Sequence, residues 1–300
     1  MGAVNMSKQT IFTGSGVAIV TPMKADGSVN YEKYRELIEW QIESGTDAII
    51  ACGTTGESST LTHEEHIGVM RAAVEQAAGR IPVISGTGSN DTAYCIELSQ
   101  EAEKLGADAL LLVTPYYNKT SQRGLVAHYT AVADAVNLPI LLYNVPSRTG
   151  VDIKPETVAA LSKHPNIVAV KEANGNISSA AQVAALCDID IYSGNDDQIV
   201  PLLSLGGKGV ISVMANVEPR RTHDIVAKWM AGDVEGSRAL QLELLELASA
   251  MFMDVNPIPV KEAMNLMGLD VGEYRLPLYG MDDAAKSKLA SVLRKYRLMK

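Results

Sequence analysis

The chain has 300 residues, of which 47% are hydrophobic and 20% charged, an ordinary globular composition that excludes a disordered or fibrous protein. Its 26 basic and 35 acidic residues give a net charge of −9, and no block of Lys or Arg stands out, so nucleic acid is not expected as a partner. The length allows one large barrel-type domain with an appendage, or two medium-sized domains.

The cysteines and the start of the chain bear on its location. Cys52, Cys95 and Cys187 are far apart and lack Cys-x-x-Cys spacing, which argues against a disulfide framework and a zinc site and fits a reducing cytoplasm. The first ten residues lack an apolar core, and Met6 breaks the Ser/Thr requirement of a myristoylation signal. No apolar run is long enough to cross a bilayer. We therefore expect a cytoplasmic protein without a membrane partner.

Short runs rich in Val, Ile and Leu recur along the chain and predict eight β-strands. These runs cover residues 16–20, 47–51, 81–85, 109–113, 139–143, 166–170, 189–193 and 209–213. Between them lie longer segments with apolar residues at helical spacing, such as Tyr34, Leu37, Ile38 and Ile42. Strands and helices are therefore expected to alternate.

The character of these strands favours a particular fold. Near-continuous apolar strands indicate burial on both faces, as in a parallel sheet covered by helices, and eight such units favour a closed (β/α)8 TIM barrel over residues 1–233. An open doubly wound sheet is the alternative, but the first strand–helix loop lacks the Gly-x-Gly-x-x-Gly fingerprint of dinucleotide binding. Residues 234–300 lack strand signals and predict a C-terminal helical domain, with helices at about 234–251, 257–268 and 282–297.

In a barrel of this kind, active-site residues follow the carboxyl ends of the strands. The first polar segment in such a position is GTTGES, residues 53–58. Its two glycines allow a tight turn, and Thr54 and Thr55 can converge on an anion such as a carboxylate. A compact loop whose threonines bond to their own backbone is the competing interpretation.

The segment YNVPSRTG, residues 143–150, follows the fifth predicted strand. Tyr143 supplies a phenol that can donate or accept a proton, and Arg148 can hold a carboxylate with two hydrogen bonds. A buried aromatic at the barrel rim and a solvated loop charge are the plainer interpretations of these residues. Both interpretations stay open when this segment is considered by itself.

Lys171 directly follows the sixth apolar run and is expected to project at the barrel mouth. Other lysines, such as Lys163 and Lys228, fall on helical segments where an ammonium group is readily solvated. A lysine shielded from water favours the free amine, which can attack a keto group and form an imine. The alternative is a structural ion pair with a carboxylate at the end of a neighbouring strand.

Together, these stretches resemble the dihydrodipicolinate synthase / N-acetylneuraminate lyase superfamily of pyruvate-dependent class I aldolases. The resemblance is carried in order by GTTGES, PYYNK (115–119), YNVPSRTG, VKEANGN (170–176), YSGND (192–196), GGKGVISV (206–213) and NPIPVK (256–261). It implies that Lys171 forms a Schiff base with pyruvate and that the enamine attacks L-aspartate 4-semialdehyde. The product would cyclise to 4-hydroxytetrahydrodipicolinate on the route to diaminopimelate and lysine. No cofactor is expected.

The resemblance also implies a proton relay formed by Tyr143, Thr54 and Tyr117. In this superfamily the tyrosine that corresponds to Tyr117 reaches in from a neighbouring subunit. An isolated barrel would then have an incomplete site, and a homotetramer built as a dimer of dimers is expected.

Four further residues are expected, by the same resemblance, to contact the substrates. Thr55 would bind the carboxylate of pyruvate, the main chain of Gly194 and Ile211 would line the pyruvate pocket, and Arg148 would hold the carboxylate of the semialdehyde. An N-acetylneuraminate or 2-keto-3-deoxy sugar-acid lyase would keep the lysine and the tyrosine, but Arg148 suits a short carboxylated aldehyde better than a polyol. A barrel that only senses keto acids or amino acids is the non-catalytic alternative.

The lysine-feedback site of some superfamily members maps onto a further set of residues. These are Ser58, Ser59, His63, His66, Asn90 and Tyr116. Sensitive members carry an acidic residue where this chain has Tyr94, so a charge-assisted bond is lost and weak or absent inhibition by lysine is expected. His63 and His66 miss the His-Glu-x-x-His spacing by one residue, so they are expected as a surface pair on a capped helix, and no metal is expected.

Overall fold

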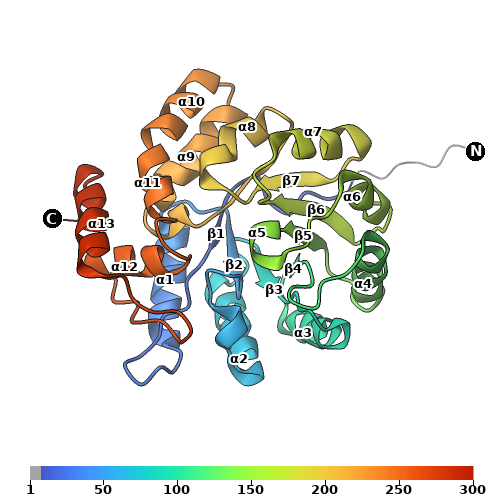
Figure 1. Ribbon diagram of the computed structural model, residues 1–300, viewed down its shortest axis with the longest axis horizontal. Helices are drawn as coiled ribbons and strands as arrows, with labels where there is room; N and C mark the ends of the chain where they lie inside the picture. The colour runs from blue at the N-terminus through green and yellow to red at the C-terminus, as the bar shows by residue number, and fades with distance from the viewer. Residues whose placement is uncertain (1–7, 300) are drawn as a thin grey trace, which may run out of the picture.

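Eight parallel strands form a closed barrel in the order in which they occur along the chain, and β8 pairs with β1. The computed structural model describes residues 8–299, so residues 1–7, where no targeting segment is expected, lie outside the described part. Figure 1 shows the strands in the centre and the helices around them. The predicted TIM barrel is confirmed, and the open doubly wound sheet is excluded.

The strands agree with the predicted apolar runs to within about two residues at most ends. They are β1 Gly14–Ala18, β2 Ala48–Ala51, β3 Val83–Gly86, β4 Ala109–Val113, β5 Ile140–Asn144, β6 Ile167–Glu172, β7 Asp190–Ser193 and β8 Gly209–Ser212. One correction concerns Lys171, which was expected directly after the sixth strand but lies inside it. The reason is that β6 keeps its ladder with β7 through the pairs Lys171–Tyr192 and Glu172–Ser193.

Helices follow the strands and cover the outside of the barrel. They are α1 Tyr31–Glu43, α2 His63–Ala77, α3 Thr92–Leu105, α4 Gln122–Asp134, α5 Pro146–Thr149, α6 Pro155–Leu161, α7 Ile177–Leu186, α8 Ile199–Leu203 and α9 Pro219–Met230. The start of α2 has a capping box, because the Thr62 hydroxyl accepts from Glu65 N–H and the Glu65 carboxylate accepts from Thr62 N–H. Short 3-10 turns are η1 Ser58–Thr60, η2 Asp196–Gln198 and η3 Met214–Asn216.

The barrel interior is packed with side chains that alternate along the strands with those facing the helices. The inner cluster includes Ile50, Ile84, Leu111, Leu141, Tyr192 and Ile211. Towards the mouth the residues become small. A Cβ atom on Gly86 would lie 2.3 Å from Cys52 O, and one on Gly88 would lie 2.3 Å from Val113 N, so close packing at these two positions requires glycine. Glycine at these two positions therefore lets neighbouring backbone segments approach closely beside the mouth.

Four helices follow the barrel. They are α10 Val234–Glu243, α11 Leu245–Ala250, α12 Ile258–Leu266 and α13 Asp283–Lys295. The helix predicted over residues 234–251 is therefore two helices, which are separated at Leu244. Figure 1 shows α12 and α13 at the edge of the molecule, beside the barrel helices. Leu247, Met264 and Leu289 of this part share one buried apolar cluster with Val226 of α9, so the domain division after residue 233 stays a prediction.

No helix within residues 8–299 is long and apolar enough to cross a membrane.

Candidate active site

Lys171 and Tyr143 form the centre of the candidate site. They are directly paired in the ladder between β5 and β6, and both are buried, at 5% and 7% exposure. Lys171 Nζ lies 4.2 Å from the centroid of the Tyr143 ring. Within residues 8–299, no carboxylate oxygen lies within the 4.0 Å of an ion pair with this nitrogen. The structural ion pair considered from the sequence is therefore not formed, and the amine faces a phenol at the barrel mouth.

Asp196 is a buried carboxylate in the same region that the sequence reasoning did not single out. It follows β7, and its Oδ2 accepts hydrogen bonds from Val213 N–H at 3.1 Å and Met214 N–H at 2.8 Å. Burial raises the pKa of Asp196, while its hydrogen bonds and the positive charge of Lys171 act in the opposite direction. Asp196 thus anchors the end of β8 and adds negative potential near the lysine. Its only sequence signal was its place in the YSGND motif.

The GTTGES loop is held by a residue from the C-terminal part of the chain. Asn256 Nδ2 donates to Thr55 Oγ1 at 3.0 Å, and Asn256 O accepts from Arg148 Nη2 at 2.8 Å. Thr55 is buried. Because its hydroxyl oxygen accepts from Asn256, its own proton remains available to another acceptor. Asn256 Oδ1 is buried and has no hydrogen-bond partner among residues 8–299. Asn256 therefore connects Thr55 and Arg148, the two residues expected to bind the carboxylates of the substrates. It was not singled out from the sequence.

The same loop is fixed by a buried ion pair. Lys261 Nζ of α12 lies 2.7 Å from Glu57 Oε1, and both side chains have 0% exposure. Glu57 adopts a left-handed backbone conformation with φ 54°, and its Oε2 accepts from Arg275 N–H at 3.1 Å. Burial lowers the pKa of Lys261, and the negative charge of Glu57 opposes this change. Helix α12 and the segments around Asn256 and Arg275 therefore contribute to the position of this loop.

Two neighbouring cavities with shared lining residues open beside these residues. A small one of about 40 Å³ is lined by Thr54 and Tyr143, and a larger one of about 310 Å³ is lined by Thr54 and Arg148. They share Thr54, Ser58, Gly88 and Val113. The shared lining residues thus bring Thr54, Tyr143 and Arg148 to neighbouring cavities, whereas Lys171 lines neither of the two.

The residues expected to form a lysine site divide between two cavities. Ser58, Ser59, His66 and Tyr116 line the 310 Å³ cavity together with Tyr94. His63 does not line this cavity but contacts Tyr94, which does: its Nδ1 lies 3.4 Å from the Tyr94 hydroxyl. Asn90 lines a neighbouring cavity of about 400 Å³. Five of the six residues thus lie at or next to one cavity, and Asn90 does not.

The expectation of a surface histidine pair is wrong for His66. This residue is 7% exposed, and its Nε2 lies 2.8 Å from Gly86 O. Burial lowers the pKa of His66, and the hydrogen bond to Gly86 only partly opposes the change. His66 faces inward because α2 packs on β2 and β3. Within residues 8–299, no group of three or more His, Cys, Asp or Glu side chains is arranged to hold a metal ion.

Three other residues expected in the site do not line these two cavities. Tyr117 is 91% exposed and has a left-handed backbone conformation, with φ 67°. Gly194 donates its N–H to Glu172 O at 2.7 Å. Ile211 is fully buried in the inner cluster of the barrel. One subunit alone therefore does not place Tyr117 beside Thr54 and Tyr143.

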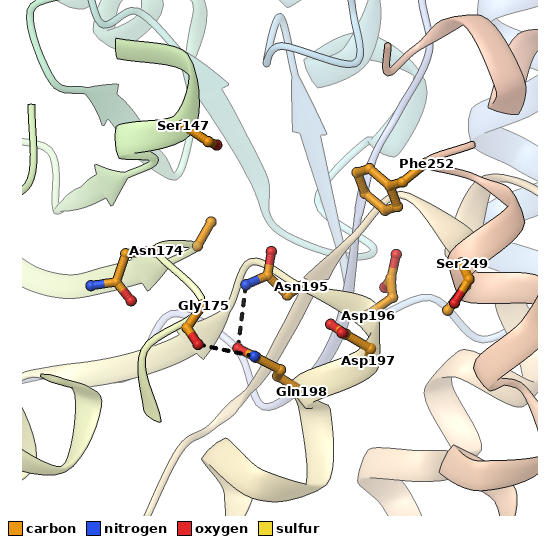
Figure 2. Close-up of a pocket in the computed structure, with 11 residues that line it drawn as sticks. Ser147, Asn174, Gly175, Asn195, Asp196, Asp197, Gln198, Ser249 and Phe252 are labelled. Carbon is orange, nitrogen blue, oxygen red and sulfur yellow. Dashed lines mark hydrogen bonds between the residues drawn. The ribbon is translucent and has the colours of Figure 1, made fainter. Parts of the chain in front are cut away.

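A separate cavity of about 460 Å³ lies beside Asp196, between the segments that follow β6 and β7 and helix α11 (Figure 2). In Figure 2, Asn195 Nδ2 donates to Gln198 Oε1 at 3.3 Å, and Gln198 Nε2 donates to Gly175 O at 3.2 Å. Phe252 covers the opposite side and is 47% exposed. This cavity shares no lining residue with the two cavities at the mouth.

The profile of the Dihydrodipicolinate synthetase family matches residues 11–296. The chain belongs to this family. It is 59% identical over 292 residues to the 4-hydroxy-tetrahydrodipicolinate synthase of Lachnoclostridium phytofermentans, covering 96% of this chain and 99% of the relative.

Solved structures of relatives have the same fold. The dihydrodipicolinate synthase of Acinetobacter baumannii, complexed with pyruvate, is 45% identical with a TM-score of 0.94, covering 97% of this chain and 100% of that one. The enzyme of Cyanidioschyzon merolae, with lysine bound, is 39% identical with a TM-score of 0.94 and the same coverage.

Proposed function

We propose that this protein condenses pyruvate with L-aspartate 4-semialdehyde through an imine on Lys171, the reaction that gives its relatives the name 4-hydroxy-tetrahydrodipicolinate synthase. The observation that carries the proposal is the buried Lys171 amine in the barrel mouth, which is in register with Tyr143 and has no carboxylate partner within residues 8–299. The pyruvate bound by the Acinetobacter baumannii relative supports this choice of first substrate. The product belongs to the biosynthesis of diaminopimelate and lysine.

The chemistry begins at the amine. Lys171 Nζ attacks the keto carbon of pyruvate, and loss of water from the carbinolamine gives the imine. Loss of a proton from the methyl group gives an enamine, whose carbon attacks the aldehyde of the second substrate. The α-amino group of that substrate then closes the ring on the imine carbon, and Lys171 is released as the free amine. Each step transfers a proton, for which the Tyr143 phenol and the Thr54 hydroxyl are the adjacent groups.

Binding of the substrate carboxylates is assigned to Thr55 and Arg148. Thr55 offers its hydroxyl proton to the pyruvate carboxylate, because its oxygen already accepts from Asn256. Arg148 lines the larger cavity and keeps most of its guanidinium donors free for the carboxylate of the semialdehyde. The carbonyl oxygen of Gly194 and the main chain of Ile211 complete the pocket.

The proposal includes a homotetramer in the cytoplasm, built as a dimer of dimers. The exposure of Tyr117 supports an assembly in which this phenol completes the relay of a neighbouring subunit. The three cysteine thiols are free, which suits a reducing compartment. Dilution tests the shared site: activity per chain is expected to fall as the subunits separate, and full activity of a monomer would contradict it.

The deciding experiment is reduction with borohydride in the presence and absence of pyruvate. We expect irreversible inactivation only with pyruvate, and a mass increment on the peptide that contains Lys171. A label on another lysine would contradict the mechanism, and binding without a label would favour a keto-acid sensor. Product formation from the semialdehyde, measured beside cleavage of N-acetylneuraminate and 2-keto-3-deoxy sugar acids, distinguishes the second substrate.

A further inference from the structure

A closed set of polar side chains lies directly behind Lys171 and Tyr143, on the outer face of β5 and β6. Successive strand residues point to opposite faces, so Asn144 and Glu172, which follow Tyr143 and Lys171, point away from the barrel interior. These two residues also pair with each other in the ladder. Asn144 is fully buried, and Glu172 is 4% exposed. The proposed chemistry uses neither of them.

The carboxamide of Asn144 is the centre of this set. Its Nδ2 donates to Asp152 Oδ1 at 2.9 Å and to the Glu172 carboxylate oxygens at 3.2 and 3.1 Å, while its Oδ1 accepts from Ile153 N–H at 3.0 Å. Asn174 donates its N–H to Glu172 Oε1 at 2.8 Å and its side-chain amide to Asp152 Oδ1 at 3.4 Å. The set therefore ties the ends of β5 and β6 to the segment that follows α5.

Two carboxyl groups thus share one amide donor group. Burial raises the pKa of Glu172 to about 7, and the negative charge of Asp152 adds to this rise against the hydrogen bonds from Asn144 and Asn174. Burial also acts on Asp152, but hydrogen bonds from Lys154, Asn144 and Asn174 outweigh it and lower the pKa of Asp152. Asp152 is therefore ionised near neutral pH, while Glu172 exchanges its proton there.

The other charged groups around the pair are few. Lys154 Nζ lies 2.8 Å from Asp152 Oδ2, and the exposed Glu156 in the first turn of α6 adds negative charge next to Lys154. Lys171 precedes Glu172 in the chain but points to the opposite face of β6. The charge of Asp152 is therefore the main ionic influence on Glu172.

We propose that Glu172 is a positioning residue that holds Lys171 and Tyr143 in register through Asn144 and makes their alignment depend on its own ionisation. Ionised Glu172 accepts charge-assisted hydrogen bonds from Asn144 and Asn174, and protonation weakens both. Imine formation therefore rises with pH as Glu172 loses its proton. The inference rests on the proposed function, because Lys171 must be the amine that reacts.

The stability of the fold responds to the same proton in the opposite direction. The pKa of Glu172 is higher in the folded chain than in the unfolded chain, so the folded chain binds more protons between the two values. This contribution to stability is full below the ordinary carboxyl pKa and is lost as the pH rises through about 7. A purely structural Glu172 would make activity fall with stability, whereas a positioning Glu172 makes activity rise over the same range.

The test measures the rate of pyruvate-dependent borohydride labelling of Lys171 as a function of pH in four proteins. In the native protein we expect the rate to rise with an apparent pKa of about 7. Glu172→Gln is expected to abolish this rise and to lower kcat/KM for pyruvate roughly tenfold, because the amine is less well aligned. Asp152→Asn is expected to keep the rise but to move it to lower pH, since the nearby negative charge is gone. Glu156→Gln is the matched control and should behave like the native protein.

Three results would overturn the inference or its basis. A native pH profile in Glu172→Gln would assign the titration to another group, such as the amine of Lys171 itself. An unmoved profile in Asp152→Asn would contradict the coupling of the two carboxyl groups, and this variant decides the question even where Glu172→Gln does not fold. Absence of a label on Lys171 in the native protein would contradict the proposed function, and this inference with it.

Discussion

The two halves of the candidate site are built in different ways. Lys171 and Tyr143 lie inside neighbouring strands, where ladder pairing and burial fix their positions. Thr55 lies in a loop and Arg148 in the four-residue helix α5, and the positions of both side chains depend on Asn256, which is 201 residues from Thr55 in the sequence. The groups proposed to react are thus supplied by the barrel, whereas the groups proposed to bind the substrate carboxylates are held by the C-terminal part of the chain.

This difference explains why a helical appendage accompanies the barrel. Lys261 of α12 forms an ion pair with Glu57 of the GTTGES loop, and both side chains are fully buried. Loops at a barrel mouth are the parts that vary most between enzymes of this fold. A loop that is anchored from outside the barrel can be rigid without help from strand pairing. Damage to the strand half should therefore stop the chemistry, while damage to the appendage should affect stability and substrate binding.

The largest effect is expected for Lys171→Arg. Arginine keeps the positive charge but cannot form the imine, so kcat should fall roughly ten-thousandfold or more. A coupled assay of product formation measures this loss, and Lys163→Arg on the exposed surface is the control. If the variant retained more than about a hundredth of the native kcat, covalent catalysis by this residue would be excluded.

The appendage half is tested by Lys261→Met. The substitution leaves Glu57 buried without its partner, and loss of one member of a buried ion pair typically costs about 3–5 kcal/mol of unfolding free energy. Urea unfolding measures the change. The control is Lys286→Met, because Lys286 pairs with Glu262 at 3.3 Å but its side chain is 40% exposed, so less than about 1 kcal/mol is expected.

Equal losses of unfolding free energy in Lys261→Met and Lys286→Met would contradict the importance assigned to the buried pair. Adding Glu57→Gln to Lys261→Met should recover part of the stability, since no uncompensated charge then remains buried. The double variant is still expected to bind substrates less well than the native protein. That combination of recovered stability and impaired binding would separate the anchoring of the loop from the general stability of the fold.

The strand half could be predicted from the sequence because its signals are local. Apolar runs with helical segments between them give a barrel, and a lysine at the end of such a run must lie near the mouth. Even there, the predicted end of the sixth strand is two residues short. Lys171 lies inside β6, because Lys171 and Glu172 continue the ladder with β7. Glu172 stands in the VKEANGN motif, but its neighbours Asn144 and Asp152 could not be identified, because Asn144 lies on another strand and Asp152 in the segment after α5, where no local pattern indicates the contact.

The appendage half could not be predicted to the same extent. Asn256 and Lys261 both belong to NPIPVK, yet nothing local indicates that they contact a loop about 200 residues earlier. The break at Leu244 is not marked by proline or glycine, so helical periodicity continued across it. His66 followed a capping box typical of a surface helix, but the packing of α2 on the barrel buries it. In each case tertiary packing overrides a local pattern.

A smaller effect is expected for Arg148→Ala, which tests whether the loop half selects the second substrate. Loss of the charge-assisted hydrogen bonds should raise the KM for L-aspartate 4-semialdehyde roughly tenfold or more, with the KM for pyruvate little changed. Initial rates with each substrate varied in turn provide the measurement. Arg123→Ala, at an exposed position of α4, is the control. An unchanged KM for the semialdehyde would remove Arg148 from substrate recognition.

The smallest effect concerns the cavity that Tyr94 shares with Ser58, Ser59, His66 and Tyr116. We propose that the native protein is inhibited by lysine weakly or not at all, because a tyrosine offers no carboxylate to the amino group of the effector. Tyr94→Glu should introduce inhibition, with half-maximal inhibition at a lysine concentration at least roughly tenfold lower than in the native protein. Tyr94→Phe, which adds no charge, should respond to lysine like the native protein. Submicromolar inhibition of the native protein would show that the cavity holds lysine without an acidic residue at this position.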